Sequence, residues 1–132
     1  MFDGWLYQFF EDKVEFDVAQ QRCWAEVGGS VASIVSGEEL DFYLVLLGEM
    51  TTNNQIWLGG KLSEDATSIV WNDGSEAVDF GWPLAGSATT PGACLVQNTG
   101  NGEWEELPCT RRRAATPQRN PRARSPPRPS AA

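Results

Sequence analysis

The sequence predicts an α+β domain in which two helices pack on small antiparallel sheets joined by a long irregular loop. Two segments with apolar residues at helical spacing lie in the first half, and short apolar strands follow in the second. A stretch rich in Gly, Pro, Ala and Thr interrupts those strands. The 132 residues suffice for one domain of ordinary size. We therefore expect a folded domain over residues 1–109 and a disordered Arg/Pro-rich basic tail over residues 110–132.

The first elements are predicted to be a strand and a helix. Aromatic residues alternate within residues 5–16, which is typical of a half-buried strand. Asp17 is the expected N-cap of the helix, and Gly28 is expected to end it in a left-handed conformation. The apolar face of this helix is expected to carry Ala19, Cys23 and Val27.

The second helix is predicted from a capping pattern and an apolar stripe. Ser36 is followed three residues later by Glu39, an arrangement in which the two residues satisfy each other's backbone N–H groups. We expect the helix to end at Gly48. Its apolar stripe repeats at helical spacing and consists of Leu40, Tyr43, Leu44 and Leu47.

The second half is predicted to contain only strands, turns and one long loop. Strands are expected over residues 55–60, 68–71, 94–97 and 103–107. Asn72-Asp73-Gly74 is expected to form a turn. Residues 75–92 are weakly patterned, and a loop of that length in a compact domain is usually functional or poorly ordered.

The charge of the chain is divided sharply between its two parts. Residues 1–109 carry a formal net charge of −15, whereas residues 110–132 carry +7 from seven arginines without any acidic residue. A domain at −15 repels phosphate, which argues against nucleic-acid binding by the folded part and favours cations or basic proteins as partners. A solvated acidic surface without a specific role is the simpler interpretation. The tail allows the same two interpretations, a basic arm for membranes or nucleic acid or a solvated segment.

Some functional classes are excluded or disfavoured by what the chain lacks. It contains no histidine, which removes histidine-based acid–base catalysis and the commonest zinc ligand. Its longest aliphatic patch, residues 44–47, is far shorter than the roughly 20 residues of a membrane span, so we expect no transmembrane segment. No signal peptide is visible at the N-terminus.

Seven short motifs occur in one order along the chain. They are Ala19 with Cys23; Gly28-Gly29; residues 36–39; Trp57-Leu58-Gly59-Gly60; Trp71-Asn72-Asp73-Gly74; Phe80-Gly81-Trp82; and Cys94 with Trp104 and Cys109. Their order over residues 5–109 resembles that of the C-type lectin-like domain family, whose fold we therefore expect. Trp57, Gly59, Trp71 and Trp104 are then expected in the structural core, because large indoles can anchor a small domain and glycines let strands approach.

The resemblance also assigns roles to the cysteines. Cys94 and Cys109 would lie on neighbouring strands, and a disulfide between them would stabilise the domain by about 3 kcal/mol. The alternative is three buried free thiols in a reducing compartment. The family's partner for Cys23, on a final strand, is missing, so we expect that closing strand to be absent and Cys23 to be unpaired and free to form a disulfide-linked dimer. The disulfide would place the domain in a secreted protein or in the ectodomain of a larger one.

The sugar-binding members of this family hold Ca²⁺ at the long loop, and this chain departs from their pattern. The loop over residues 82–93 contains no carboxylate and no side-chain amide, and Glu105-Glu106 replace the usual Asn-Asp pair. We therefore name no metal ligand in this loop, and binding of Ca²⁺ at another site is left as an alternative. Trp71-Asn72-Asp73 spells the Trp-Asn-Asp string that is associated with calcium in this family. It lies before the long loop and is followed by glycine, so we interpret it as a structural turn.

A different polar site could form near the last strand. Its candidate ligand-binding residues are Asn98, Asn101, Glu103, Glu105 and Glu106, and the alternative is an exposed acidic strand and turn. We expect an extracellular recognition module that binds a glycan or a protein, rather than an enzyme. The alternatives are a non-functional product with a truncated or altered ending, and a hydrolase that uses two carboxylates such as Glu103 and Glu106.

Overall fold

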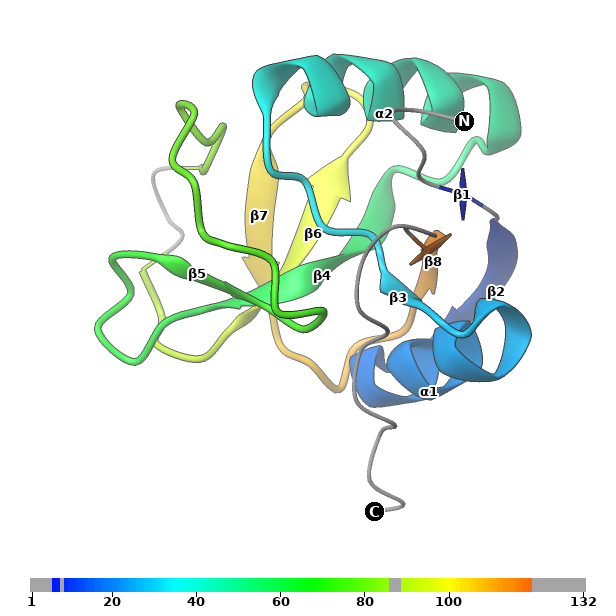
Figure 1. Cartoon of the computed structure of the whole chain (residues 1–132), viewed down its shortest axis with the longest axis horizontal. Coiled ribbons are helices and arrows are strands. Elements are labelled where there is room, and N and C mark those ends of the chain that lie inside the picture. The colour runs from blue at the N-terminus through cyan, green and yellow to red at the C-terminus, as the bar shows by residue number, and fades with distance from the viewer. Residues whose placement is uncertain (1–5, 8, 86–88, 120–132) are drawn as a thin grey trace.

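The computed structural model describes residues 6–7, 9–85 and 89–119, in which a twisted sheet separates two helices (Figure 1). The strand order of the six-stranded main sheet is β2-β8-β4-β6-β7, with β5 paired to β4. The pairs are antiparallel except for β4 and β8, which run parallel. Its strands are β2 (Phe10–Val14), β4 (Gln55–Leu62), β5 (Ile69–Trp71), β6 (Cys94–Asn98), β7 (Trp104–Leu107) and β8 (Arg113–Ala115).

A smaller sheet joins the two ends of the described chain. It has the order β1-β9-β3 and consists of β1 (Leu6–Tyr7), β3 (Ser30–Val31) and β9 (Pro117–Arg119). Both pairs are antiparallel, and β9 lies between its partners. The first and last described strands are therefore direct neighbours.

The helix α1 (Phe16–Val27) begins earlier than the sequence predicts. Its N-cap is Glu15, and Asp17 lies inside the first turn. The reason is tertiary: Phe16 is fully buried, and its backbone N–H donates a hydrogen bond of 3.1 Å to the carbonyl oxygen of Cys109. The predicted end is confirmed, because Gly28 has a φ of 65° and its N–H donates to Trp24.

The helix α2 (Gly37–Met50) begins as predicted. The Ser36 hydroxyl accepts the N–H of Glu39 at 3.1 Å, and the Glu39 carboxylate accepts the N–H of Val35 at 2.8 Å, one residue before the expected donor. The helix continues two residues past Gly48, because this glycine retains a helical conformation. No helix within residues 6–7, 9–85 and 89–119 is both long and apolar enough to cross a bilayer.

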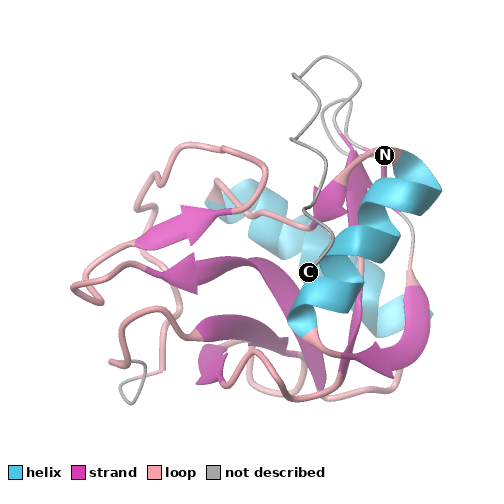
Figure 2. Cartoon of the chain, turned by 90° about the horizontal axis from the view of Figure 1, so that it is seen from below, coloured by secondary structure: helices cyan, strands magenta, loops and turns pink. Residues whose placement is uncertain are grey.

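Two hydrophobic clusters fill the space on either side of the main sheet. One, packed under α2 and the long loop, contains Tyr43, Leu47, Ile56, Leu58, Trp71, Leu95 and Trp104. The other, packed against α1, contains Phe10, Phe16, Ala19, Cys23, Trp57, Cys94 and Val96. Figure 2 shows the helices and the strands from below, at right angles to the view of Figure 1. The side chains of Trp57, Trp71 and Trp104 are at most 3% exposed, as the sequence predicts.

Gly59 lets the connection between the helices cross the sheet closely. Its N–H donates a hydrogen bond of 2.8 Å to the carbonyl oxygen of Ala32. A Cβ atom at this position would overlap the backbone carbonyl of Val31. Glycine is therefore required here for space rather than for an unusual backbone conformation.

The predicted boundary at residue 109 and the predicted absence of the closing strand are both wrong. Residues 113–119 form β8 and β9, and β8 lies between β2 and β4. Ala114, Ala115 and Thr116 are fully buried. Ala114 lies in the cluster under α2 and Ala115 in the cluster against α1, and the strand is held by its backbone pairing with β2 and β4 rather than by large apolar residues. The remainder of the predicted tail, residues 120–132, lies outside the described residues.

The prediction that Cys23 is free to form an intermolecular disulfide is also wrong for the folded domain. Cys23 is unpaired, but its side chain is fully buried in the same cluster as Ala115. Burial raises the pKa of the thiol far above its usual value. A buried, protonated thiol cannot reach another chain unless the domain opens.

Candidate ligand-binding surface

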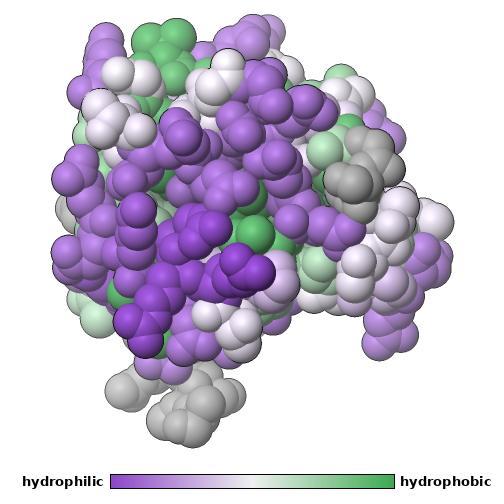
Figure 3. All heavy atoms as spheres, turned by 180° about the vertical axis from the view of Figure 1, so that it is seen from behind, coloured by the Kyte–Doolittle hydropathy of each residue, from purple (hydrophilic) through white to green (hydrophobic). Residues whose placement is uncertain are grey.

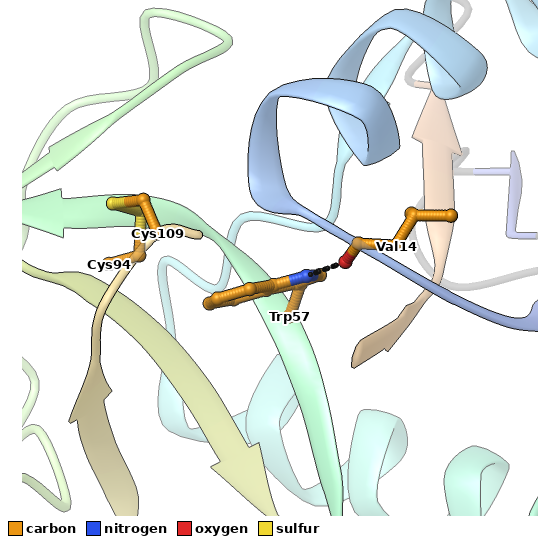
Figure 4. Close-up of a disulfide and its surroundings, with 4 residues drawn as sticks. All are labelled: Val14, Trp57, Cys94 and Cys109. Carbon is orange, nitrogen blue, oxygen red and sulfur yellow. Dashed lines mark hydrogen bonds between the residues drawn. A yellow bond between two sulfur atoms is a disulfide. The ribbon is translucent and has the colours of Figure 1, made fainter. Parts of the chain in front are cut away.

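A disulfide closes the base of the long loop. Cys94 and Cys109 are bonded, with their Cα atoms 5.2 Å apart, which confirms the predicted pair. Figure 4 shows the bond beside β4, where the indole N–H of Trp57 donates to the carbonyl oxygen of Val14 at 2.8 Å. The bond therefore ties the start of β6 to the segment that follows β7, next to a partly buried hydrogen bond that joins β4 to β2.

The long loop returns to the sheet and adds to its edge at β7. Leu84 forms an isolated parallel bridge with Trp104. The Trp104 N–H donates to the carbonyl oxygen of Pro83 at 2.8 Å, and the Ala85 N–H donates to the carbonyl oxygen of Trp104 at 2.8 Å. The loop thereby covers the first residue of an edge strand that would otherwise be open.

The Glu106 carboxylate holds a second part of the same loop. One oxygen accepts the N–H of Thr89 at 3.2 Å, and the other accepts the N–H of Thr90 at 3.1 Å. Partial burial opposes the charge on Glu106, but the hydrogen bonds from Thr90 and Thr89 outweigh it, so the pKa of this carboxyl is lowered. Glu106 thus stays ionised and connects β7 to the loop.

An aromatic cluster supports the loop from the core side. The ring of Trp104 makes edge-to-face contacts with Trp71 at 5.8 Å and with Phe80 at 6.0 Å between ring centroids. The Trp104 indole N–H donates to the Gln97 side-chain oxygen at 2.7 Å. Trp104 therefore fixes the loop through its side chain as well as through its backbone.

Glu105 points to the opposite face of β7, as alternation along a strand requires. One of its carboxylate oxygens accepts a hydrogen bond from the Asn98 amide at 3.0 Å and another from the Gln55 amide at 3.3 Å. Gln55 lies directly opposite Asn98 in the sheet. Gln55 was not predicted from the sequence, since its placement depends on the register of β4 against β6.

Asn101 and Glu103 belong to the turn between β6 and β7. The Asn101 amide donates to the Glu103 carboxylate at 3.1 Å, and the Asn101 side-chain oxygen accepts the N–H of Glu103 at 2.9 Å. The Asn98 side-chain oxygen accepts the N–H groups of Gly100 and Asn101. The five candidate residues therefore divide into three groups: Asn98 with Glu105, Asn101 with Glu103, and Glu106 with the loop.

The described residues offer no clear metal site. No group of three or more histidine, cysteine or acidic side chains within residues 6–7, 9–85 and 89–119 is arranged to hold an ion. Asp73, in the string that imitates a calcium motif, accepts hydrogen bonds from the Ser33 hydroxyl at 2.6 Å and the Ser75 N–H at 2.8 Å. It shapes the turn after β5, in agreement with the sequence-based interpretation.

Comparison with known proteins agrees with this architecture. The family model for the lectin C-type domain matches residues 12–116. The beta subunit of the snaclec bothrojaracin from Bothrops jararaca is 28% identical, covering 83% of this chain and 73% of that protein. The A subunit of the snaclec coagulation factor IX-binding protein from Protobothrops flavoviridis is 31% identical, covering 82% and 86%. The structure of human lithostathine superimposes with a TM-score of 0.80 at 21% identity, covering 91% and 95%. The chain therefore belongs to the C-type lectin domain family.

Proposed function

We propose that the domain is an extracellular recognition module that binds a protein ligand through β7 and the long loop, without calcium. An extracellular location is supported by the Cys94–Cys109 disulfide, because such bonds persist in oxidising compartments. The proposed binding surface consists of β5, the face of β7 that carries Glu106, and the described parts of the loop, residues 75–85 and 89–93. In Figure 1 this surface lies on the far side of the molecule from α1.

The observation that carries the proposal is the contact of Glu106 with Thr89 and Thr90. Both carboxylate oxygens are used to hold backbone N–H groups of the loop. This contact and the backbone hydrogen bonds of Trp104 together hold the loop in one conformation, and all of the groups involved belong to the protein itself. A preformed loop lowers the entropy cost of binding a ligand.

The composition of the surface favours a protein as the ligand. Val70 on β5 is 58% exposed and Val78 at the start of the loop is 46% exposed. A protein partner that covers these two side chains would remove their apolar area from water, which favours binding. The relative from Protobothrops flavoviridis is itself named for binding a coagulation factor.

Two observations count against the alternative functions. The carboxylates of Glu103 and Glu106 are each engaged by neighbouring backbone or side-chain groups, so neither is poised as half of a catalytic pair. The truncated-product hypothesis was motivated by a missing closing strand, and β8 fills that place.

A binding screen with defined ligands tests the proposal. Full-length chain is immobilised and probed with a panel of purified secreted proteins and a glycan array, in calcium and in EDTA. We expect a protein ligand whose affinity is equal in both buffers and falls roughly tenfold in Val78→Ser, as for a residue near the centre of an interface. Val45→Ser is the matched control, because Val45 is 64% exposed on α2, away from the loop. Binding confined to glycans and abolished by EDTA would overturn the proposal.

A further inference from the structure

Three consecutive arginines follow the disulfide in a segment whose two ends are fixed. Cys109 is bonded to Cys94, and Arg113 is the first residue of β8. The Arg111 N–H also donates to the carbonyl oxygen of Pro108 at 3.0 Å. Arg111 and Arg112 are exposed, and Arg113 is half-buried. The backbone that carries these three positive charges is therefore held in one place rather than being part of a loose tail.

None of these arginines is neutralised by a carboxylate among the described residues. The ion pairs found there are those of Arg22 with Asp12 and Glu26. This is unexpected in a chain whose acidic residues outnumber the basic ones by 18 to 10. The face of the molecule in Figure 3 is largely hydrophilic, and its darkest purple, the colour of the most hydrophilic residues, is gathered in one area. The run over residues 111–113 therefore carries three positive charges without an ion-pair partner among the described residues, on a domain that is acidic as a whole.

Arg113 is oriented by a row of polar side chains across four strands. Its Nε donates to the Gln55 side-chain oxygen at 2.8 Å, and one terminal nitrogen donates to the backbone oxygen of Arg112 at 2.6 Å. The Gln55 amide in turn donates to Glu105, which also accepts from Asn98. The row runs from β8 through β4 and β6 to β7, a width of about 14 Å at about 4.8 Å between neighbouring strands.

These contacts leave particular donors and acceptors open. Both hydrogen bonds to Glu105 end on the same oxygen, so its other oxygen has no partner among the described residues. The second terminal nitrogen of Arg113 likewise has none there. A planar guanidinium binds a two-oxygen anion through parallel hydrogen bonds, whereas carboxylate and amide groups bind hydroxyls.

We propose that Arg111, Arg112 and Arg113, with the row of Gln55, Asn98 and Glu105, form a binding site for a sulfated glycan. The arginines bind the sulfate groups, and the polar row binds hydroxyls of the adjoining sugar. A sulfated glycan fits better than duplex DNA, because the polar row beside the arginines can bind sugar hydroxyls, which the deoxyribose units within a duplex do not offer. Glu105 and Glu106 point to opposite faces of β7, so this site is separate from the long-loop surface and stands whether or not that surface binds a protein.

Titration of the full chain with a dextran sulfate oligosaccharide tests the site, with uncharged dextran of equal length and a DNA duplex as comparison probes. We expect dextran sulfate to bind more tightly than the duplex and uncharged dextran not to bind measurably. The double variant Arg111→Gln/Arg112→Gln should lose roughly tenfold or more in affinity, with a smaller dependence on salt. Lys13→Gln removes an exposed positive charge from β2, the strand beside β8, and so measures how much of the affinity comes from general charge attraction near the site; it should change the affinity less than twofold.

Two further variants separate this site from simple charge attraction. Gln55→Ala removes no charge but releases Arg113, and we expect it to weaken dextran sulfate binding by roughly threefold to tenfold. The variant Arg122→Gln/Arg124→Gln/Arg128→Gln removes three charges beyond the described residues and should retain most of the affinity. The proposal is overturned if Arg122→Gln/Arg124→Gln/Arg128→Gln abolishes binding while Arg111→Gln/Arg112→Gln does not. It is also overturned if Gln55→Ala binds dextran sulfate as tightly as the parent, or if the duplex binds as tightly as dextran sulfate.

Discussion

The Glu106 side chain connects β7 to Thr89 and Thr90 in the second half of the long loop. Replacing it by glutamine keeps one acceptor oxygen and places an NH₂ group opposite the other N–H. We expect Glu106→Gln to lower the free energy of loop opening by about 1 kcal/mol, which accelerates amide hydrogen exchange at Thr89 and Thr90 roughly fivefold. Glu105→Gln is the matched control and should leave the exchange of both amides unchanged. Equal exchange in the parent and Glu106→Gln would contradict the assigned role.

The same carboxylate makes the loop sensitive to acid. The pKa of Glu106 is lowered in the folded state, so its contribution is fully present above the pKa of an unfolded glutamate. That contribution is lost as the pH falls through the lower, folded-state value. Amide NMR shifts of Thr89 and Thr90 should therefore titrate together below the ordinary glutamate pKa. A midpoint above that value, or independent titration of the two amides, would contradict this linkage.

Cys23 should react slowly in the folded domain. Its side chain is fully buried, and burial raises the pKa of the thiol, so the reactive thiolate is scarce at neutral pH. We expect a thiol reagent such as DTNB to label the native chain far more slowly than the chain in denaturant. Under non-reducing conditions the protein should form no disulfide-linked dimer. Rapid labelling without denaturant would show that the α1 cluster is open.

The closing strands β8 and β9 can be tested as elements by shortening the chain. A chain ending at residue 112 loses the partner of β2 and the parallel partner of β4. It should therefore fail to unfold cooperatively and should aggregate through the exposed strand edges. A chain ending at residue 119 keeps both strands and should melt within a few degrees of the full chain. Equal melting of the two shortened chains would mean that β8 and β9 contribute little.

The sequence predicts most of the elements because their signals are local. The helix boundary at Gly28, the cap at Ser36 and the buried face formed by Ala19 and Cys23 need only the neighbouring residues to be recognised. Trp57 predicts β4 because a large indole beside glycines is typical of a core strand.

The elements that the sequence missed depend on contacts between distant segments. Ala114 and Ala115 are too small to signal a core strand, and an arginine- and proline-rich composition suggests disorder. They become part of a buried strand because the fold places them between β2 and β4. The same limit applies to the polar row, since the contact of Gln55 with Arg113 requires a parallel pairing that no local pattern predicts.

For the candidate site, the sequence identified most of the polar residues but not how they are grouped. Glu105 and Glu106 are adjacent in the chain, and strand alternation alone predicts that they diverge. It cannot predict that Glu106 contacts Thr89 and Thr90, because the course of an irregular loop is set by tertiary contacts. The position of Asn98 opposite Gln55 is likewise a matter of register.

For the molecule as a whole, the disulfide joins the loop-bearing part of the sheet to the closing strands. Cys94 begins β6, and Cys109 lies in the connection from β7 to β8. The bond closes a segment with a sequence separation of 15, which corresponds to a stabilisation of about 3 kcal/mol in the unfolded-chain entropy model. The variant Cys94→Ala/Cys109→Ala should unfold at a correspondingly lower denaturant concentration. Mild reduction of the parent should lower its midpoint to a similar extent, and an unchanged midpoint in both cases would contradict this estimate.

The recognition role depends most on a long loop that takes its shape without calcium. The most direct measurement is amide hydrogen exchange of Thr89 and Thr90 in the full chain, first in EDTA and then with excess calcium. We expect both amides to be protected in EDTA and calcium to leave their exchange rates unchanged. Exchange at the rate of an unstructured peptide in EDTA, with protection appearing only when calcium is added, would contradict it.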